Sequence, residues 1–253
     1  VTPRRLSVCD VGTIASLGIA EVRVMKRPKL GIVSTGDEVR EPGDSIGDGE
    51  IYNSNGVQLI AHARRTGYEP RYYGIAKDTE EDLRRHLETA FAENEVICLS
   101  GGVSKGEFDY VPRVLSSLGV ETLFHRVAMK PGRPTFFGRR EISGKRQFVF
   151  GLPGNPVSTF VTFELFAVRL LHRMAGTSPP EARCGARLAN TVKKGDPERT
   201  EFIPVALEGE SARPVRYGGS SHLNALSQAD ALLQVSIGTT EIKGGTFVAL
   251  RPL

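Results

Sequence analysis

Three acidic residues each follow a stretch of sequence that predicts a β-strand: Glu38, Asp78 and Asp109. In a parallel sheet the carboxyl ends of the strands lie at one edge, so these side chains can meet although they are far apart in the chain. Carboxylates held close together repel one another unless a cation joins them, and Mg²⁺ prefers such oxygen ligands. We therefore predict that the three acids bind Mg²⁺ or another divalent metal and take part in catalysis. Two simpler interpretations stay open, since Asp109 also suits a helix N-cap and Asp78 a turn.

A basic turn, Lys130-Pro131-Gly132-Arg133-Pro134, is the second candidate for chemistry. Proline fixes φ and glycine permits positive φ, so the sequence predicts a rigid turn. Arg133 offers a planar fork of donors and Lys130 a compact charge, and together they suit a small oxyanion. For this turn taken alone, two solvated surface charges on a rigid hairpin end remain the simpler interpretation.

Two glycine-containing segments also follow predicted strands, Ser100-Gly101-Gly102-Val103-Ser104 and Pro153-Gly154-Asn155-Pro156. In the first segment, the glycines let the backbone approach a ligand, and free N–H groups with serine hydroxyls can bind an anion. The second, like the basic turn, is a rigid Pro-Gly-x-Pro turn, and the two turns could form the wall of a pocket. The first segment lacks the G-x-x-x-x-G-K-[ST] pattern of a nucleotide-binding P-loop. Each segment alone is also typical of an ordinary tight turn.

Composition excludes several classes of protein. Hydrophobic residues make up 40% of 253 residues, and 33 Lys+Arg against 29 Asp+Glu leave a small net charge of +4, as in an ordinary globular protein. The cysteines Cys9, Cys98 and Cys184 are scattered, which argues against a disulfide framework or a thiolate zinc site. We find no Ser–His–Asp pattern, dinucleotide fingerprint, nucleic-acid module, signal peptide or apolar stretch long enough for a membrane span. We therefore expect a cytoplasmic protein with neither nucleic-acid nor membrane partners.

The elements that must position these residues alternate between strand and helix. Predicted strands cover 30–33, 70–75, 95–99, 120–127, 135–137 and 147–150, and predicted helices cover 55–66, 80–92, 109–118 and 157–174. This order predicts an α/β fold for 28–175, with a doubly wound, mostly parallel sheet.

The pattern of predicted elements changes on either side of residues 28–175. Beyond the Pro-Gly-Ser stretch at 176–180, short β-like runs broken by glycine predict a small all-β barrel over 176–253. Residues 1–27 form a lead-in with a short helix over 7–17 and a short strand over 22–24, and we interpret this lead-in as the remnant of an N-terminal domain.

Taken in order, these segments resemble the molybdopterin molybdotransferase family, which includes the C-terminal domain of gephyrin. The resemblance covers nearly the whole chain and is carried by Ser34-Thr35-Gly36-Asp37-Glu38, Asn53-Ser54-Asn55, Ser100-Gly101-Gly102-Val103-Ser104, Asp109-Tyr110, Lys130-Pro131-Gly132-Arg133-Pro134 and Gly151-Leu152-Pro153-Gly154-Asn155-Pro156-Val157-Ser158. It implies that molybdate is inserted into adenylylated molybdopterin with release of AMP, in a step that needs a divalent metal.

The resemblance also implies roles for individual residues. Glu38, Asp78 and Asp109 match acids linked to nucleotide cleavage and metal. The basic positions near molybdate match Arg126, Lys130 and Arg133, although Arg126 stands where a lysine is common. Further substrate-binding positions are Thr35, Gly36, Asp37, Ser100, Gly101, Gly102, Val103, Ser104, Pro131, Gly132, Pro153, Gly154, Asn155, Pro156 and Ser158 in the α/β domain, and Arg199, Ser220 and Ser221 in the barrel.

The same resemblance bears on partners and on alternatives. It implies a homodimer and an upstream molybdopterin adenylyltransferase, and it implies about 150 further residues in front of the part seen here. A non-catalytic molybdopterin-binding or scaffold module of the same fold is the alternative function, and the presence of all three acids favours the enzyme. A related domain that adenylylates molybdopterin is disfavoured by the predicted barrel.

Overall fold

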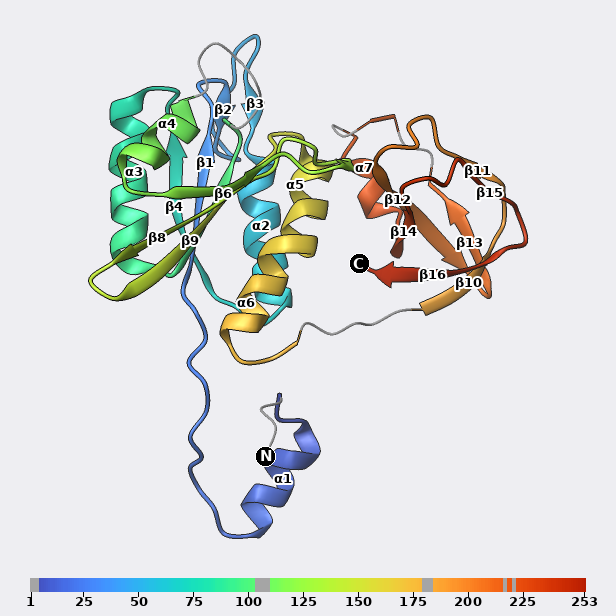
Figure 1. The fold of residues 1–253 in the computed structure, drawn as a ribbon, viewed down its shortest axis with the longest axis horizontal. Coiled ribbons are helices and arrows are strands. Elements are labelled where there is room, and N and C mark those ends of the chain that lie inside the picture. Colours follow the sequence, from blue (N-terminus) through green and yellow to red (C-terminus); the bar gives the residue numbers. More distant parts are fainter. Residues whose placement is uncertain (1–4, 103–109, 179–183, 216–217, 220–221) are drawn as a thin grey trace.

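The computed structural model describes residues 5–102, 110–178, 184–215, 218–219 and 222–253. It consists of an α/β domain, a β-barrel beside it and an extended N-terminal lead-in (Figure 1). The α/β domain has a six-stranded sheet in the order β4-β1-β5-β9-β8-β6. Its strands are β1 (Leu30–Thr35), β4 (Pro70–Ala76), β5 (Val96–Ser100), β6 (Glu121–His125), β8 (Phe136–Ile142) and β9 (Lys145–Leu152).

The sheet is mixed, as expected for a mostly parallel fold. Strands β4, β1, β5 and β9 run parallel, whereas β8 runs antiparallel to both β9 and β6. Every residue of β1 and of β5 is buried, which is typical of strands covered on both faces. A small ribbon of β2 (Val39–Arg40) and β3 (Ile51–Tyr52) follows β1.

Helices cover both faces of the sheet, so the predicted doubly wound architecture is confirmed (Figure 1). One face packs against α3 (Glu80–Glu93) and α4 (Tyr110–Ser117). The other packs against α2 (Ser54–Arg65) and α6 (Val168–Met174), while α5 (Pro156–Thr162) contacts α2 and the end of β9. The single long helix predicted from residue 157 is interrupted by a π-helical turn over Phe163–Ala167, a feature that apolar periodicity does not reveal.

The C-terminal part is a closed five-stranded barrel, as predicted. The strands are β10 (Cys184–Leu188), β12 (Thr200–Glu208), β13 (Ser211–Pro214), β14 (Ala231–Val235) and β16 (Phe247–Pro252). Strand β13 pairs with both β10 and β12, which closes the sheet and removes its free edges. The short elements β11 (Val192–Lys193), β15 (Glu241–Ile242) and α7 (Asn224–Ser227) complete the domain.

The barrel and the α/β domain share a small apolar core. The two-residue strand β7 (Met129–Lys130) leaves the α/β domain and pairs in parallel with the start of β12. Beneath this pairing, Met129, Val157 and Val161 cluster with Phe202 and Leu232 of the barrel. The sequence prediction of one strand over 120–127 is therefore wrong at its end, because β6 stops at His125 and the chain turns to join the barrel.

The lead-in is the least buried part of the chain. Helix α1 (Val8–Ser16) begins where predicted, and Ser7 and Asp10 form a capping box at its start, yet the helix buries no residue. The strand predicted over 22–24 does not form, and Val24 is 71% exposed. No described helix is both long and apolar enough to cross a membrane.

A charged edge of the α/β sheet as the candidate functional site

The register of the sheet brings five loops to one edge. Thr35 at the end of β1 pairs with Ala76, and Ser34 pairs with Ser100 at the end of β5. Ser100 in turn pairs with Leu152, the last residue of β9. Gly151 pairs with Phe136, where β8 begins, and Phe136 pairs with His125, where β6 ends. The loops that follow β1, β4, β5, β9 and β6 therefore all leave from this edge, which we call the charged edge.

Two aspartates face each other where β1 and β4 end. The Asp37 backbone N–H donates to Asp78 Oδ2 at 3.4 Å, and the Asp78 N–H donates to Asp37 Oδ1 at 3.1 Å. The surrounding protein partly removes Asp78 from water, and this desolvation, with the charges of Asp37 and Glu38, raises the pKa of its carboxyl. Within the described residues no Lys or Arg forms an ion pair with Asp37, Glu38 or Asp78. The Arg40 guanidinium donates to the Asp37 carbonyl at 2.8 Å, but its ion pair is with Glu50, so the described part of the chain leaves these three carboxylates without an ion-paired cation.

A buried hydrogen-bond network fixes the end of β1. Asn53 caps α2 by accepting from the Gly56 N–H at 2.9 Å, and it also accepts from the Ser34 hydroxyl at 3.0 Å. Its amide donates to the Tyr72 hydroxyl at 2.6 Å, which donates to Glu41 Oε1 at 2.6 Å. Burial and the Glu41 carboxylate raise the pKa of Tyr72, so the phenol stays protonated. The network ties β1, α2 and β4 together directly beneath the aspartates.

The glycines after β5 are required by close packing. Both take positive φ, +99° at Gly101 and +64° at Gly102. A Cβ at Gly101 would lie 2.7 Å from Thr35 Oγ1 and 2.8 Å from the Thr35 carbonyl oxygen, distances that real side chains do not reach. A Cβ at Gly102 would lie 2.7 Å from Val111. The backbone after β5 therefore runs directly against Thr35, next to the acidic loop.

The segment after β9 is held by α2 and α5. Asn55 donates its amide to the Gly154 carbonyl at 2.7 Å, and the buried Thr159 hydroxyl donates to the Pro153 carbonyl. Ser158 is 3% exposed, so it lies inside the domain rather than on the open edge. Of this segment, Gly154 and Asn155 are exposed beside the glycine loop, since a Cβ on Gly154 would lie 3.7 Å from Gly101 Cα.

The basic turn lies at the other end of the charged edge and is bound to the barrel. Lys130 Nζ lies 2.9 Å from Glu201 Oε1 of β12. A Cβ on Gly132 would lie 2.4 Å from Thr162 of α5, so the buried Pro131-Gly132 part packs against that helix. Arg126 takes a positive φ of 106°, and both Arg126 and Arg133 are exposed. The turn therefore packs tightly at Pro131 and Gly132, and one of its cations, Lys130, already has a partner.

Arg199 of the barrel comes next to this turn through strand pairing. The residue after it, Thr200, pairs with Met129 and donates its N–H to the Ala128 carbonyl at 2.9 Å. The guanidinium Nε of Arg199 donates to Asp196 Oδ2 at 2.5 Å. The structure thus brings Arg199 together with the basic turn, although about 70 residues separate them in the chain.

The two groups of charges share an edge but are not in contact. Three strand intervals separate β1 from β8, which corresponds to roughly 14 Å at the usual spacing of neighbouring strands.

The predicted residues Val103, Ser104, Asp109, Ser220 and Ser221 lie outside the described residues. Among the residues that are described, no group of three His, Cys, Asp or Glu side chains has a geometry that would hold a metal ion by itself.

The carboxylates of the acidic end are nevertheless of the chemical type that Mg²⁺ binds. Two aspartates in mutual backbone contact, with a third acid beside them and one raised pKa, form a hard-oxygen site whose charges a cation would relieve. Mg²⁺ commonly takes only one or two carboxylates and completes its shell with water and phosphate oxygens. Asp37 and Asp78, with Glu38, are the described residues that would hold it.

The structure gives several residues contacts that the sequence alone does not predict. The resemblance places Asp37 only among the substrate-binding residues, whereas in the structure it forms the acidic pair with Asp78. Asn53, Asn55 and Tyr72 were not expected in the site at all, although the Asn-Ser-Asn segment belongs to the resemblance. An asparagine directly before the first residue of a helix is an N-cap signal, and this signal could have identified Asn53.

Two protein-family models match the chain, one for each domain. A family model described as "probable molybdopterin binding domain" matches residues 31–173. A second, described as "MoeA C-terminal region (domain IV)", matches residues 186–253. The two matches correspond to the α/β domain and to the barrel.

Individual relatives lead to the same family. A molybdopterin molybdenumtransferase of Staphylococcus aureus is 31% identical over 240 residues, which cover 93% of this chain and 56% of the relative. The crystal structure of a molybdopterin biosynthesis MoeA protein from Pyrococcus horikosii superposes with a TM-score of 0.84 at 33% identity, over 98% of this chain and 60% of that one. A molybdenum cofactor biosynthesis protein from Pyrococcus furiosus gives a TM-score of 0.75 at 26% identity, over 98% and 76%.

This chain thus spans just over half the length of the curated relatives that it matches. Both of its domains, in the same order, match models of one kind of protein, and the arrangement of both domains matches a solved member. The chain therefore belongs to the molybdopterin molybdotransferase family.

Proposed function

We propose that this chain is the catalytic part of a molybdopterin molybdotransferase, which inserts molybdate into adenylylated molybdopterin and releases AMP. The observation that carries the proposal is the Asp37–Asp78 pair at the charged edge, in which each carboxylate accepts from the other's backbone N–H and neither forms an ion pair with a described Lys or Arg. A site that is anionic by itself suits a divalent cation that would neutralise a substrate phosphate. A metal bound here would supply that neutralisation and orient the phosphate for cleavage.

The chain's own residues define where each part of the substrate would bind. The glycine backbone after β5 and the exposed Gly154 lie in the middle of the edge, where a long ligand can lie close to the main chain. The cations Arg126, Lys130 and Arg133, with Arg199, stand at the far end, and we propose that they bind molybdate there. The separation of roughly 14 Å between the strands that carry the two groups requires an extended substrate, and an adenylylated pterin is extended.

Several wider assignments belong to the same proposal. We propose that Asp109, Val103 and Ser104 complete the acidic and glycine loops, and that Ser220 and Ser221 face the edge from the barrel. We also propose a cytoplasmic homodimer supplied by a molybdopterin adenylyltransferase, with functional domains over 28–175 and 176–253. The family resemblance supports these assignments.

The decisive experiment measures AMP release from adenylylated molybdopterin in the full-length protein, with and without molybdate, as a function of Mg²⁺. We expect release to need Mg²⁺ and to stop with a chelator. Asp78→Asn keeps the side-chain size and one acceptor oxygen but removes the charge. It should lower the rate by about 100-fold or more, the usual order for loss of a group that stabilises transition-state charge. Asp109→Asn should do the same while leaving the melting temperature near that of the wild type.

The matched control is Glu208→Gln, which removes one carboxylate from an exposed pair with Arg213 on the barrel. This variant should turn over normally. Wild-type AMP release that is indifferent to a chelator would contradict the metal-dependent mechanism. Normal turnover in Asp78→Asn would contradict the role of the acidic pair. Binding of the pterin without any turnover in the wild type would favour the scaffold function instead.

A further inference from the structure

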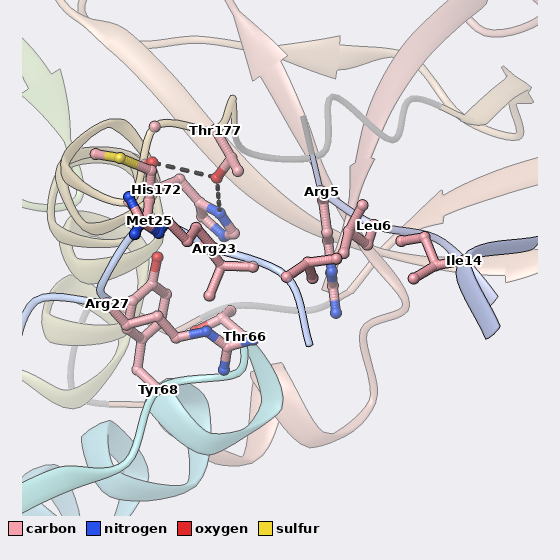
Figure 2. A pocket seen from close by; sticks show the side chains of 14 residues that line it. Arg5, Leu6, Ile14, Arg23, Met25, Arg27, Thr66, Tyr68, His172 and Thr177 are labelled. Carbon is pink, nitrogen blue, oxygen red and sulfur yellow. Dashed lines mark hydrogen bonds between the residues drawn. The ribbon is translucent and has the colours of Figure 1, made fainter. Parts of the chain in front are cut away.

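Two neighbouring tyrosines of β4, Tyr72 and Tyr73, lie on opposite faces of the sheet. Tyr72 packs against the core beneath α2 and α6, and Tyr73 packs against the core beneath α3 and α4. Both residues are half-buried. Tyr68 lies just before the strand, at the edge opposite the charged one, where its ring meets that of His172 edge-on at 5.6 Å (Figure 2). Beyond the two tyrosines the strand leads to Asp78, so a residue held on β4 is in a position to affect the acidic end.

The two phenols have the same hydrogen-bond pattern. Tyr72 donates to Glu41 Oε1 at 2.6 Å and accepts from the Asn53 amide at 2.6 Å. Its neighbour in the strand donates to Glu93 Oε2 at 2.5 Å and accepts from the Asn94 amide at 2.6 Å. Each asparagine is a buried helix cap, one at the start of α2 and the other at the end of α3. The two tyrosines are thus chemically matched and differ in which part of the domain they hold.

Tyr72 holds the loop that carries Asp37. Glu41 belongs to this loop, which runs from β1 to α2, and directly follows its first strand, β2. Asn53 ends the same loop, and its backbone N–H donates to the Arg40 carbonyl at 2.7 Å. The phenol therefore contacts the loop at two points and ties it to β4, the strand that leads to the second aspartate.

Tyr73 holds the far end of a helix instead. Glu93 is the last residue of α3, and Asn94 follows it with an amide that also donates to the Ala90 carbonyl at 2.7 Å. Glu93 forms an ion pair with Arg71 as well, at 2.7 Å. These contacts secure the end of α3 against β4 and include no residue of the acidic loops. Tyr73 therefore reports what such a phenol contributes to stability, without any effect on the aspartates.

We propose that Tyr72 is a positioning residue that sets the separation of Asp37 and Asp78. It acts through Glu41 and Asn53, which it joins to β4. One of the two backbone bonds between the aspartates is 3.4 Å long, beyond the usual range, and both lie near solvent. The bonds of Tyr72 are both 2.6 Å long and partly buried, so they are the firmer connection. The inference rests on the proposed function only in taking this acidic pair as the place where a metal binds.

The test compares Tyr72→Phe with Tyr73→Phe in the full-length protein. Each variant loses one phenol that bridges a carboxylate and a buried amide, so the two should have similar melting temperatures. Calorimetry measures Mg²⁺ binding, and hydrogen exchange without metal follows the backbone amides of Asp37 and Asp78. Tyr72→Phe should speed the exchange of both amides and weaken Mg²⁺ binding by about tenfold or more, as is usual when a group that holds a metal ligand is lost. Tyr73→Phe should match the wild type in both measurements.

Glu41 offers a conservative pair of variants. Glu41→Gln keeps an acceptor for the phenol and should retain most of the slow exchange, whereas Glu41→Ala should resemble Tyr72→Phe. Either unchanged amide exchange or unchanged Mg²⁺ affinity in Tyr72→Phe would overturn the proposal. Equal losses in Tyr73→Phe would also overturn it, since they would indicate general destabilisation. A wild type that binds no Mg²⁺ would contradict the proposed function, and the amide exchange would then decide the positioning role by itself.

Discussion

The two ends of the charged edge carry opposite charge and are built in opposite ways. At the β1 and β4 end, Asp37 and Asp78 contact each other, and the protein raises the pKa of Asp78 while no described Lys or Arg forms an ion pair with either carboxylate. At the β6 and β8 end, Lys130 is paired with Glu201 and Arg199 with Asp196. Charges left without a partner at a fixed position indicate a ligand, whereas paired charges also have an architectural role. Of the two ends, the acidic end is therefore the better candidate for binding a ligand.

The largest expected effect concerns the glycine loop between the two ends. Gly101→Ala would place a methyl group 2.7 Å from Thr35 Oγ1 at a φ of +99°, so both the clash and the backbone strain oppose it. We expect a loss of about 2 kcal/mol or more in the free energy of unfolding. Gly144→Ala is the control, since Gly144 has a φ of +73° in open space and reports the strain alone. Urea denaturation of both variants gives the comparison, and equal losses would show that the contact with Thr35 is unimportant.

The next effect tests whether the paired cations still bind substrate. If Lys130 contacts molybdate, Lys130→Ala should raise the molybdate concentration for half-maximal AMP release by about tenfold, the value of one charge-assisted contact. Glu201→Gln removes the partner that lies 2.9 Å from Lys130 and leaves the lysine free. It should leave the molybdate requirement unchanged or lower it. A raised requirement in both variants would mean that the pair matters for joining the barrel rather than for the oxyanion.

The smallest effect concerns stability at the acidic end. An aspartate with a raised pKa in the folded state contributes stability that is present below its unfolded pKa and lost as pH rises through the folded value. Ionised Asp78 therefore costs stability at neutral pH, and Asp78→Asn should raise the Tm at pH 7 by about 1–2 °C. The gain should shrink as pH falls toward about 4, the usual range for an aspartate. Scanning calorimetry over this range checks the sign, and a lower Tm for the variant at pH 7 would contradict the unrelieved repulsion.

The same calorimetric scans separate a metal site from mere repulsion. A cation that binds the folded protein raises its Tm by mass action, so Mg²⁺ should stabilise the wild type more than Asp78→Asn. The comparison between the two ends would weaken if Mg²⁺ stabilised both proteins equally, because the acidic end would then not be the place where it binds.

Sequence by itself determined the alternation of strand and helix, the barrel and the polar loops that follow the strands. A short, fully apolar run such as the one that forms β5 is typical of a buried strand, and Gly67 and Gly119 follow helices that end where expected. These features depend on local periodicity and turn chemistry, which are written in consecutive residues. The motifs around Asp37, Gly101 and Lys130 are recognisable for the same reason, and the register of the sheet places their loops on one edge.

Tertiary structure alone decided which of those residues meet. Asp37 joined Asp78, Lys130 was paired with Glu201 by a two-residue strand, and a π-helical turn interrupted a helix that the sequence presents as continuous. The strand expected at 22–24 did not form, since a strand needs a partner for its backbone hydrogen bonds and the described chain offers none there. Such outcomes depend on the register between distant segments and on which groups compete for the same hydrogen-bond or ion-pair partner. Neither can be read from residues that are neighbours in the sequence.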